Sequence, residues 1–199
     1  DIPVNSPPTS TSEINIFEGP SNIGTNYGSR IRGYICPPMT GNYTFWIASN
    51  DHSELWISTV ENDPSAKQRI AFVEGATDPR QWTTKFSSQR SSPIMLEQGK
   101  RYYIEALHKQ GMGSDHIAVG WMLPNFSTES PIPGRHLSPF DMNDAARMAS
   151  GSDTADENAL YSEISIYPNP VPTGNAELRI SGYEGVDEII ETQEEIINL

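Results

Sequence analysis

Few residues of this sequence have the types and spacing that catalysis requires. Glu54, Glu97 and Glu105 are dispersed along the chain and do not form the paired acid and base that a glycosidase needs. The sequence contains no nucleophile elbow, phosphate-binding loop or zinc-ligand spacing. We therefore expect a protein that is not an enzyme.

The single cysteine, Cys36, adds no chemistry. One cysteine cannot form an internal disulfide bond. It follows the apolar run 31–35, and no nearby residue in the sequence supplies the charge that would activate its thiol. We expect Cys36 to be a small core residue.

The segment 49–53 has a pattern that suits either a turn or a ligand site. Asn50 and Asp51 favour a tight turn, because their short side chains hydrogen-bond to nearby backbone. Such a turn would close a hairpin. Asp51 also offers a charged pair of oxygens, and His52 beside it could hydrogen-bond a ligand hydroxyl or lie in solvent. The residues alone leave these alternatives open.

A second candidate segment spans residues 108–116. Its glycines, Gly111 and Gly113, permit backbone angles at which carbonyl oxygens can point inward. Asp115 adds a carboxylate to the same segment. Oxygen atoms of this loop could therefore contact a metal ion or another ligand.

Aromatic residues could provide a platform for a sugar ring, whose apolar face stacks on indole. Trp82 lies in the loop-like stretch 78–83 and is the best candidate for this role. Its alternative role is to cap the edge of the fold. Three other tryptophans lie in apolar, strand-like runs, where we expect them to pack in the core: Trp46, Trp56 and Trp121.

The elements that would position these residues read as β-strands. Several runs alternate between apolar and polar residues, which buries one face of a strand and exposes the other. Clusters of Pro, Gly, Asn and Asp separate the runs, and no helical period longer than about ten residues is present. The expected strands are 29–36, 41–49, 53–58, 69–74, 100–108 and 116–123. Short strands at this spacing predict an all-β, antiparallel, jelly-roll-like β-sandwich.

Composition agrees with a loop-rich β protein. The 199 residues are 36% hydrophobic and include 15 Gly and 16 Pro. No apolar run is long enough for a membrane span, so we expect no membrane insertion. Residues 1–12 are rich in Pro, Ser and Thr, and we interpret them as a connector or the start of the first domain within a longer protein.

The net charge of −13 is concentrated in the last third of the chain. Residues 1–140 carry 13 acidic and 11 basic side chains, whereas residues 141–199 carry 13 acidic side chains and two arginines. The first part is therefore close to neutral and has no basic stripe for a phosphate backbone. We expect no nucleic acid partner, and an uncharged ligand such as a sugar suits this surface.

Several blocks of residues 13–140, in order, resemble the protective-antigen-type lectin domain, a family that includes the sugar-binding domains of yeast flocculins and adhesins. The resemblance implies a lectin-like β-sandwich that binds a glycan or polysaccharide. The matching blocks are 31–35, 41–51, 53–58, 99–109, 117–121, 131–134 and 137–140.

The resemblance also implies a calcium site. In that family two consecutive acidic residues, joined by a cis peptide bond, hold a Ca²⁺ ion that contacts sugar hydroxyls. Asn50 and Asp51 occupy the matching positions, so Asn50 departs from the pattern and contributes a neutral oxygen. We expect Asn50, Asp51, Asp115 and the loop at Gly111 and Gly113 to hold the ion, with His52 and Trp82 as further ligand-binding residues.

A second resemblance concerns the C-terminal part. The string 166–170 followed by 176–180 is similar to the start of the sorting domain that Bacteroidetes-type bacteria use for type IX secretion. We expect an acidic, flexible linker at 141–161 and an incomplete, β-rich sorting domain at 162–199. This implies a secreted or bacterial cell-surface protein.

These observations predict a non-catalytic, possibly calcium-dependent carbohydrate-binding module that acts together with other domains of the same parent chain. Two alternatives remain from the sequence. One is a structural or protein-interaction spacer that does not bind sugar, which the neutral Asn50 favours. The other is an accessory module of a polysaccharide-degrading enzyme.

Overall fold

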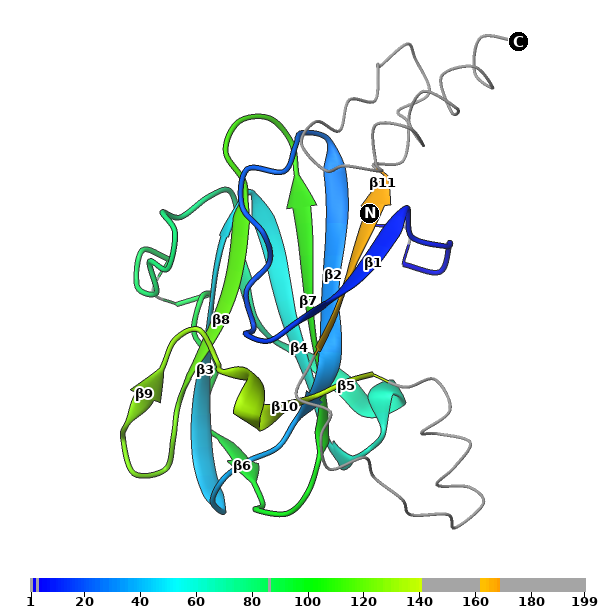
Figure 1. Cartoon of the computed structure of the whole chain (residues 1–199). Coiled ribbons are helices and arrows are strands. Elements are labelled where there is room, and N and C mark those ends of the chain that lie inside the picture. The colour runs from blue at the N-terminus through cyan, green and yellow to red at the C-terminus, as the bar shows by residue number, and fades with distance from the viewer. Residues whose placement is uncertain (1, 3, 86, 141–161, 169–199) are drawn as a thin grey trace, which may run out of the picture.

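Two antiparallel sheets form a β-sandwich (Figure 1). The structure, a computed structural model, describes residues 2, 4–85, 87–140 and 162–168. Within these residues the only helices are two short 3₁₀ turns, η1 (Pro64–Ala66) and η2 (Gly134–His136), and no helix is long and apolar enough to cross a membrane. The predicted all-β sandwich is confirmed.

The larger sheet has the strand order β1-β11-β2-β7-β4-β5, and β10 pairs with the end of β2. The smaller sheet has the order β6-β3-β8-β9. The strands of the larger sheet are β1 (Ser10–Ile14), β2 (Tyr27–Ile35), β4 (His52–Glu61), β5 (Lys67–Val73), β7 (Tyr102–Gln110), β10 (Leu137–Ser138) and β11 (Ser162–Pro168). Those of the smaller sheet are β3 (Gly41–Asn50), β6 (Ile94–Leu96), β8 (His116–Met122) and β9 (Thr128–Glu129).

The six strands expected from sequence correspond to β2, β3, β4, β5, β7 and β8, with ends that differ by a few residues. Their arrangement in the two sheets corrects one expectation, that residues 50–51 could close a hairpin. β3 and β4 follow each other in the chain but belong to different sheets. Residues 50–51 therefore do not close a hairpin; they carry the chain from one sheet to the other.

The core lies between the inner faces of the sheets, and β3 shows how the sequence builds it. Tyr43, Phe45 and Ile47 alternate along the strand and are fully buried. Trp46, between them, points to the outer face, where it is half-buried beneath the guanidinium of Arg90 at 5.6 Å from the ring centroid. Alternation of side chains along a strand requires this arrangement.

The tryptophans therefore divide between core and surface. Trp121 is fully buried and confirms its expected place. Trp46 and Trp56 are only half-buried, which corrects the expectation that both belong to the core. Each of these two tryptophans lies between residues whose side chains point to the opposite, buried face of the strand. The apolar run alone therefore did not show which of its residues point inward.

The first and last described strands pair with each other. β11 lies between β1 and β2, with Ile164 opposite Ser12 on one side and Ile31 on the other. Ile164 and Ile166 are buried in the core cluster. Residues 162–168 thus belong to the sandwich, whereas the sequence assigned them to a separate C-terminal segment. The expected linker at 141–161 and the rest of the sorting domain, 169–199, lie outside the described residues.

A candidate ligand site at one end of the sandwich

Three connecting segments meet at one end of the sandwich. They are residues 50–51 between β3 and β4, residues 111–115 between β7 and β8, and residues 22–26 before β2. The pairing of Asn50 with His116 places the first two segments side by side. The third is tied to the second by a 2.6 Å hydrogen bond from the Asn26 amide to the Gly111 carbonyl oxygen.

The Asp51 carboxylate faces the loop of residues 111–115, the glycine loop. Its Oδ2 accepts a 2.9 Å hydrogen bond from the backbone amide of Gly111. A Cβ atom at position 111 would lie 3.1 Å from the same oxygen, so glycine allows this close approach. Within the described residues, the other carboxylate oxygen has no hydrogen-bond partner and Asp51 forms no ion pair. One charged oxygen is therefore available to a ligand.

Asn50 is held at both its backbone and its side chain. The peptide bond between Asn50 and Asp51 is cis, as the resemblance implied for this position. The side-chain Nδ2 donates to Ser114 Oγ at 3.2 Å, and the carbonyl oxygen accepts from His108 Nε2 at 2.7 Å. Asn50 thus connects the turn to both β7 and the loop that follows it.

His108 is a buried, neutral support for this turn. A carbonyl oxygen can only accept, so Nε2 carries the proton toward Asn50 and Nδ1 can accept from the Ser29 hydroxyl at 3.4 Å. Burial lowers the pKa of His108 to about 4, although the Asn50 carbonyl and the Asp51 charge act in the opposite direction. The ring is therefore uncharged at neutral pH.

Asp115 is buried beneath the loops. Its Oδ2 accepts hydrogen bonds from the backbone amides of Ile23 at 2.9 Å and Gly24 at 3.1 Å. Its charge also raises the pKa of the Tyr27 hydroxyl, after the larger effect of burial. The structure thus directs this carboxylate to the segment before β2, while Asp51 contacts Gly111. Within the described residues Asp115 Oδ1 is buried without a hydrogen-bond partner.

Two carbonyl oxygens of the loop 111–115 accept hydrogen bonds from one buried side chain. The Nε2 of the buried Gln110 donates to the carbonyl oxygens of Gly113 at 3.4 Å and Ser114 at 3.2 Å. Gly113 has φ of +97°, a backbone conformation that favours glycine. Gln110 therefore holds the loop in shape.

The two remaining candidates are placed differently. His52 is exposed and, with Asp51 and Gly111, lines a groove of about 700 Å³. Trp82 is half-buried in the connection between β5 and β6 and is not among the residues that line this groove. That connection packs nearby at Thr77, whose amide donates to the Ser49 carbonyl oxygen at 2.8 Å.

The oxygen atoms at this end of the sandwich could bind a hard cation only if carboxylate, amide and hydroxyl oxygens act together. Within the described residues no three His, Cys, Asp or Glu side chains lie close enough together to hold a metal ion. Calcium, however, accepts carboxylate, amide and backbone oxygens alike. Asp51, the Asn50 amide oxygen and the Ser114 hydroxyl supply such atoms. They fit Ca²⁺ in kind, with a single negative charge.

The fold is an antiparallel β-sandwich with a half-buried carboxylate, that of Asp51, among the loops at one end. The profile of the PA14 domain family matches residues 11–135, more than half of the chain. The chain therefore belongs to the PA14 domain family, which confirms the resemblance seen in residues 13–140.

Two curated relatives contain a similar segment within much longer proteins. The chain is 44% identical over 131 residues to mouse N-acetyl-beta-glucosaminyl-glycoprotein 4-beta-N-acetylgalactosaminyltransferase 1, a match that covers 62% of this chain and 12% of that protein. It is 31% identical over 110 residues to fibrocystin from Canis lupus familiaris, covering 51% of this chain and 3% of that protein.

The chain also matches solved structures, some of which are domains crystallised with sugars. The Epithelial Adhesin 6 A domain from Candida glabrata, in complex with Galβ1-3GlcNAc, has a TM-score of 0.47 at 12% identity and covers 67% of this chain and 69% of its own. The PA14 sugar-binding domain from an RTX adhesin has a TM-score of 0.36 at 13% identity, covering 51% of this chain and 48% of its own.

Proposed function

We propose that this domain is a non-catalytic carbohydrate-binding module, and that the turn at Asn50–Asp51 is the centre of its glycan site. The observation that carries the proposal is the position of Asp51. One of its carboxylate oxygens is fixed by the Gly111 amide, and the other has no partner within the described residues. A preorganised, partly exposed charged oxygen at the mouth of a groove is what a polyhydroxylated ligand or its bridging cation needs.

Calcium is part of the proposal. When bound, a Ca²⁺ ion supplies coordination positions that vicinal sugar hydroxyls can fill. Asp51 and Asn50 would hold it together with oxygens of the 111–115 loop. With one carboxylate in the set, we expect a dissociation constant on the order of 10⁻⁴ to 10⁻³ M, the range of extracellular calcium modules.

The other candidate residues take supporting roles in this proposal. His108 and Gln110 fix the turn and the loop from inside. Asp115 fixes the segment before β2 through the amides of Ile23 and Gly24. His52 lies in the groove, where its ring can hydrogen-bond a sugar hydroxyl.

The domain is proposed to act as one part of a longer secreted or cell-surface protein. Similar segments make up 12% of the mouse glycosyltransferase and 3% of the dog fibrocystin, which supports a module that recurs in different parent chains. Glycan and the neighbouring domains of the parent chain are its proposed partners.

A spacer without sugar binding is the second candidate function. It is favoured by Asn50, because a neutral residue there lowers the charge available for a cation. A carbohydrate-binding module binds a glycan at the groove beside Asp51 and a spacer does not, so a measurement of glycan binding distinguishes the two functions.

A glycan array probed with the 199-residue chain in 5 mM CaCl₂ and again in EDTA tests the proposal (the salt level is on the order of ten times the expected dissociation constant). We expect glycans retained with calcium and lost with EDTA, and none retained by the Asp51→Ala variant. No retained glycan in calcium, with an intact fold by circular dichroism, would favour the spacer.

A further inference from the structure

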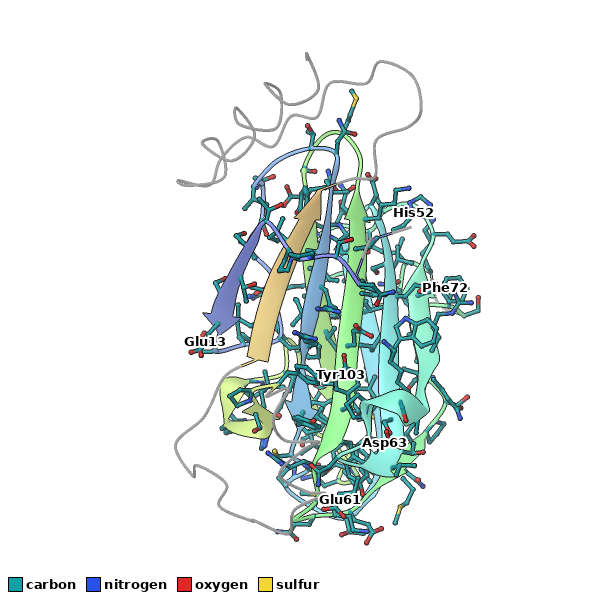
Figure 2. All side chains as sticks on the ribbon, turned by 90° about the vertical axis from the view of Figure 1, so that its right-hand side faces the viewer. Glu13, His52, Glu61, Asp63, Phe72 and Tyr103 are labelled. Atoms are coloured by element: carbon teal, nitrogen blue, oxygen red, sulfur yellow. The ribbon has the colours of Figure 1, made fainter. Side chains whose placement is uncertain are left out.

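The groove beside Asp51 continues down the outer face of the larger sheet. Asp51 and Gly111 form its upper end. Figure 2 faces this side of the molecule and shows His52 and Phe72 near one another, away from Tyr103 and Asp63 farther down the sheet. The groove volume of about 700 Å³ lies within the usual range of small-ligand pockets.

Two separate elements form the walls. On one side Phe72 of β5 stands opposite Glu54 in the strand register, and Glu54 in turn stands opposite Leu107 of β7. On the other side the N-terminal residues Ile2 and Val4 cross the outer face of β2.

The N-terminal wall is fixed to the sheet. A Cβ atom at Gly28 would lie 2.9 Å from the Ile2 side chain, so glycine lets this residue pack against the strand. The Arg30 guanidinium donates to the Val4 carbonyl oxygen at 3.3 Å. The groove is therefore bounded by a fixed wall on each side: β5 on one side, and the N-terminal residues Ile2 and Val4, held on β2, on the other.

The lining is amphipathic. Phe72 and Leu107 are half-buried and give the groove apolar surface. The polar side chains beside them carry both signs of charge, and Arg69 forms an ion pair with Glu54 while its guanidinium lies 4.8 Å from the Phe72 ring centroid. Lys109 lies in the same lining. The lining carries three carboxylates, Asp51, Glu54 and Glu74, and two cations, Arg69 and Lys109. Charged groups of both signs next to an aromatic ring suit a ligand that has both an apolar face and hydroxyl groups.

We propose that this groove is a second sugar subsite, which binds the residue adjacent to the sugar held at Asp51. The domain then recognises an oligosaccharide, and Phe72 contributes to selectivity over the corresponding monosaccharide. This inference rests on the proposed function, because Asp51 and Gly111 belong to both sites. A pyranose ring laid along Leu107 and Phe72 directs its hydroxyls toward Glu54, Arg69 and Lys109.

The test compares matched mono- and oligosaccharides. The 199-residue chain is titrated by isothermal calorimetry with a glycan retained on the array and with the terminal monosaccharide of that glycan. Phe72→Ala and Phe72→Leu remove the aromatic ring, and Leu keeps an apolar side chain in case Ala disturbs the fold. Phe126→Ala is the control, because Phe126 is 79% exposed in the connection between β8 and β9.

We expect the wild-type chain to bind the oligosaccharide about tenfold more tightly than the monosaccharide, the effect of one stacking contact. Both Phe72 variants should bring this ratio close to one, whereas Phe126→Ala keeps the wild-type ratio. Equal wild-type affinities, or a ratio that survives in both Phe72 variants, would overturn the second subsite and leave the proposed function standing. If the array retains no glycan in calcium, both proposals fail.

Discussion

His108 donates a 2.7 Å hydrogen bond from its Nε2 to the carbonyl oxygen of Asn50, 58 positions away in sequence. The contact joins a strand of the larger sheet to the residue that ends β3 in the smaller sheet. It fixes the backbone on which the Asp51 carboxylate stands. The geometry of the candidate site therefore depends on an uncharged imidazole in the interior.

Acid should weaken this support. The folded-state pKa of His108 is about 4, below the ordinary value of 6.5, so between these pH values the unfolded chain binds more protons than the folded one. The contribution of His108 to stability is complete above about pH 6.5 and is lost progressively as the pH falls to about 4. Its full size is about 3 kcal/mol, from 1.36 kcal/mol per pKa unit.

Urea denaturation of the wild type and of His108→Gln between pH 4 and pH 8 measures this effect. Gln can still donate to the Asn50 carbonyl but does not titrate. We expect the stability difference between the two proteins to shrink in acid. A difference that stays constant across this range would show that His108 titrates normally in the folded state.

Restoring a second carboxylate should strengthen calcium binding. In Asn50→Asp the new carboxylate can accept from the Ser114 hydroxyl, which now accepts from Asn50 Nδ2. Because ligand charge count tunes calcium affinity, we expect the dissociation constant to fall by about tenfold. Calorimetric titration with CaCl₂ checks this, with Asn50→Gln as the neutral control. An unchanged constant would mean that position 50 does not contact the ion.

Asp115 should matter for folding more than for the ligand. Asp115→Ala leaves the buried amides of Ile23 and Gly24 without an acceptor, and we expect a loss of about 2–4 kcal/mol of stability. Asp115→Asn retains one acceptor oxygen and should cost less. Thermal and urea denaturation rank the two variants. Equal stability of Asp115→Ala and the wild type would contradict the supporting role.

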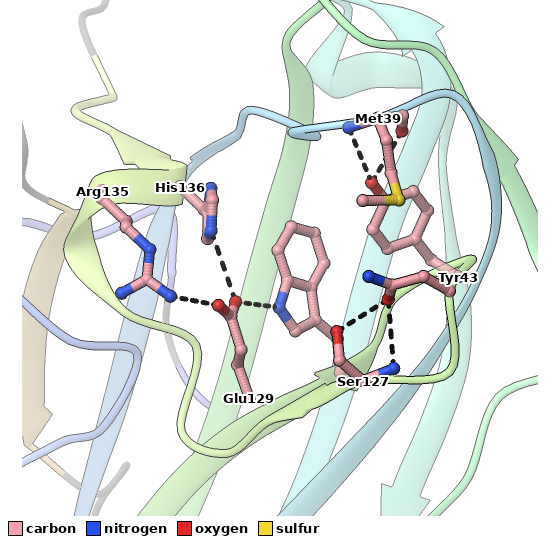
Figure 3. A network of polar contacts seen from close by, with 8 residues as sticks. Met39, Tyr43, Ser127, Glu129, Arg135 and His136 are labelled. Atoms are coloured by element: carbon pink, nitrogen blue, oxygen red, sulfur yellow. Dashed lines mark hydrogen bonds and ion pairs between the residues drawn. The ribbon is translucent and has the colours of Figure 1, made fainter.

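Glu129 allows a hydrogen bond and an ion pair to be compared at one residue. Figure 3 shows its carboxylate between Arg135 and His136. The third partner of this carboxylate is the indole of Trp121. The buried indole nitrogen donates to Glu129 Oε2 at 2.8 Å, while Arg135 is 61% exposed. A buried donor left without an acceptor costs about 1–3 kcal/mol, and an exposed ion pair contributes less than about 1 kcal/mol.

We therefore expect Glu129→Ala to lose about 1–3 kcal/mol of unfolding free energy. Glu129→Gln keeps an acceptor for the indole and should lose less than about 1 kcal/mol. Urea denaturation distinguishes the two variants. If both variants lose the same unfolding free energy, the charge of Glu129, and not its hydrogen bond to Trp121, is what stabilises the structure around Trp121.

Much of the sandwich could be predicted from sequence because alternation is a local signal. β3 shows it directly, because Tyr43, Phe45 and Ile47 alternate along the strand and are buried. β8 was found instead as a short apolar run, since it is buried along almost its whole length. β11 could not be placed in this way. Its pairing with β1 and β2 joins residues more than 130 positions apart, and no local pattern encodes such a contact.

Some features of the candidate site could likewise be predicted from sequence, and others depend on contacts between distant residues. Asn50 and Asp51 were predicted through a family resemblance, and Gly111 through the conformational freedom of glycine, whereas in the structure Gly111 allows the close approach of the Asp51 carboxylate. The direction of the Asp115 carboxylate depends on the amides of residues 23 and 24, which carry no side-chain signal. The groove at Phe72 depends on Ile2 and Val4 crossing the sheet, which only the folded chain brings about.

The central claim is that the charge of Asp51 binds a cation that in turn binds the glycan. Calorimetric titration of CaCl₂ into the wild type and into Asp51→Asn tests it most directly, because Asn keeps an oxygen to accept from the Gly111 amide and removes only the charge. We predict a dissociation constant on the order of 10⁻⁴ to 10⁻³ M for the wild type, and no binding by the equally folded variant. Equal calcium binding by both proteins, or none by the wild type, would contradict the claim.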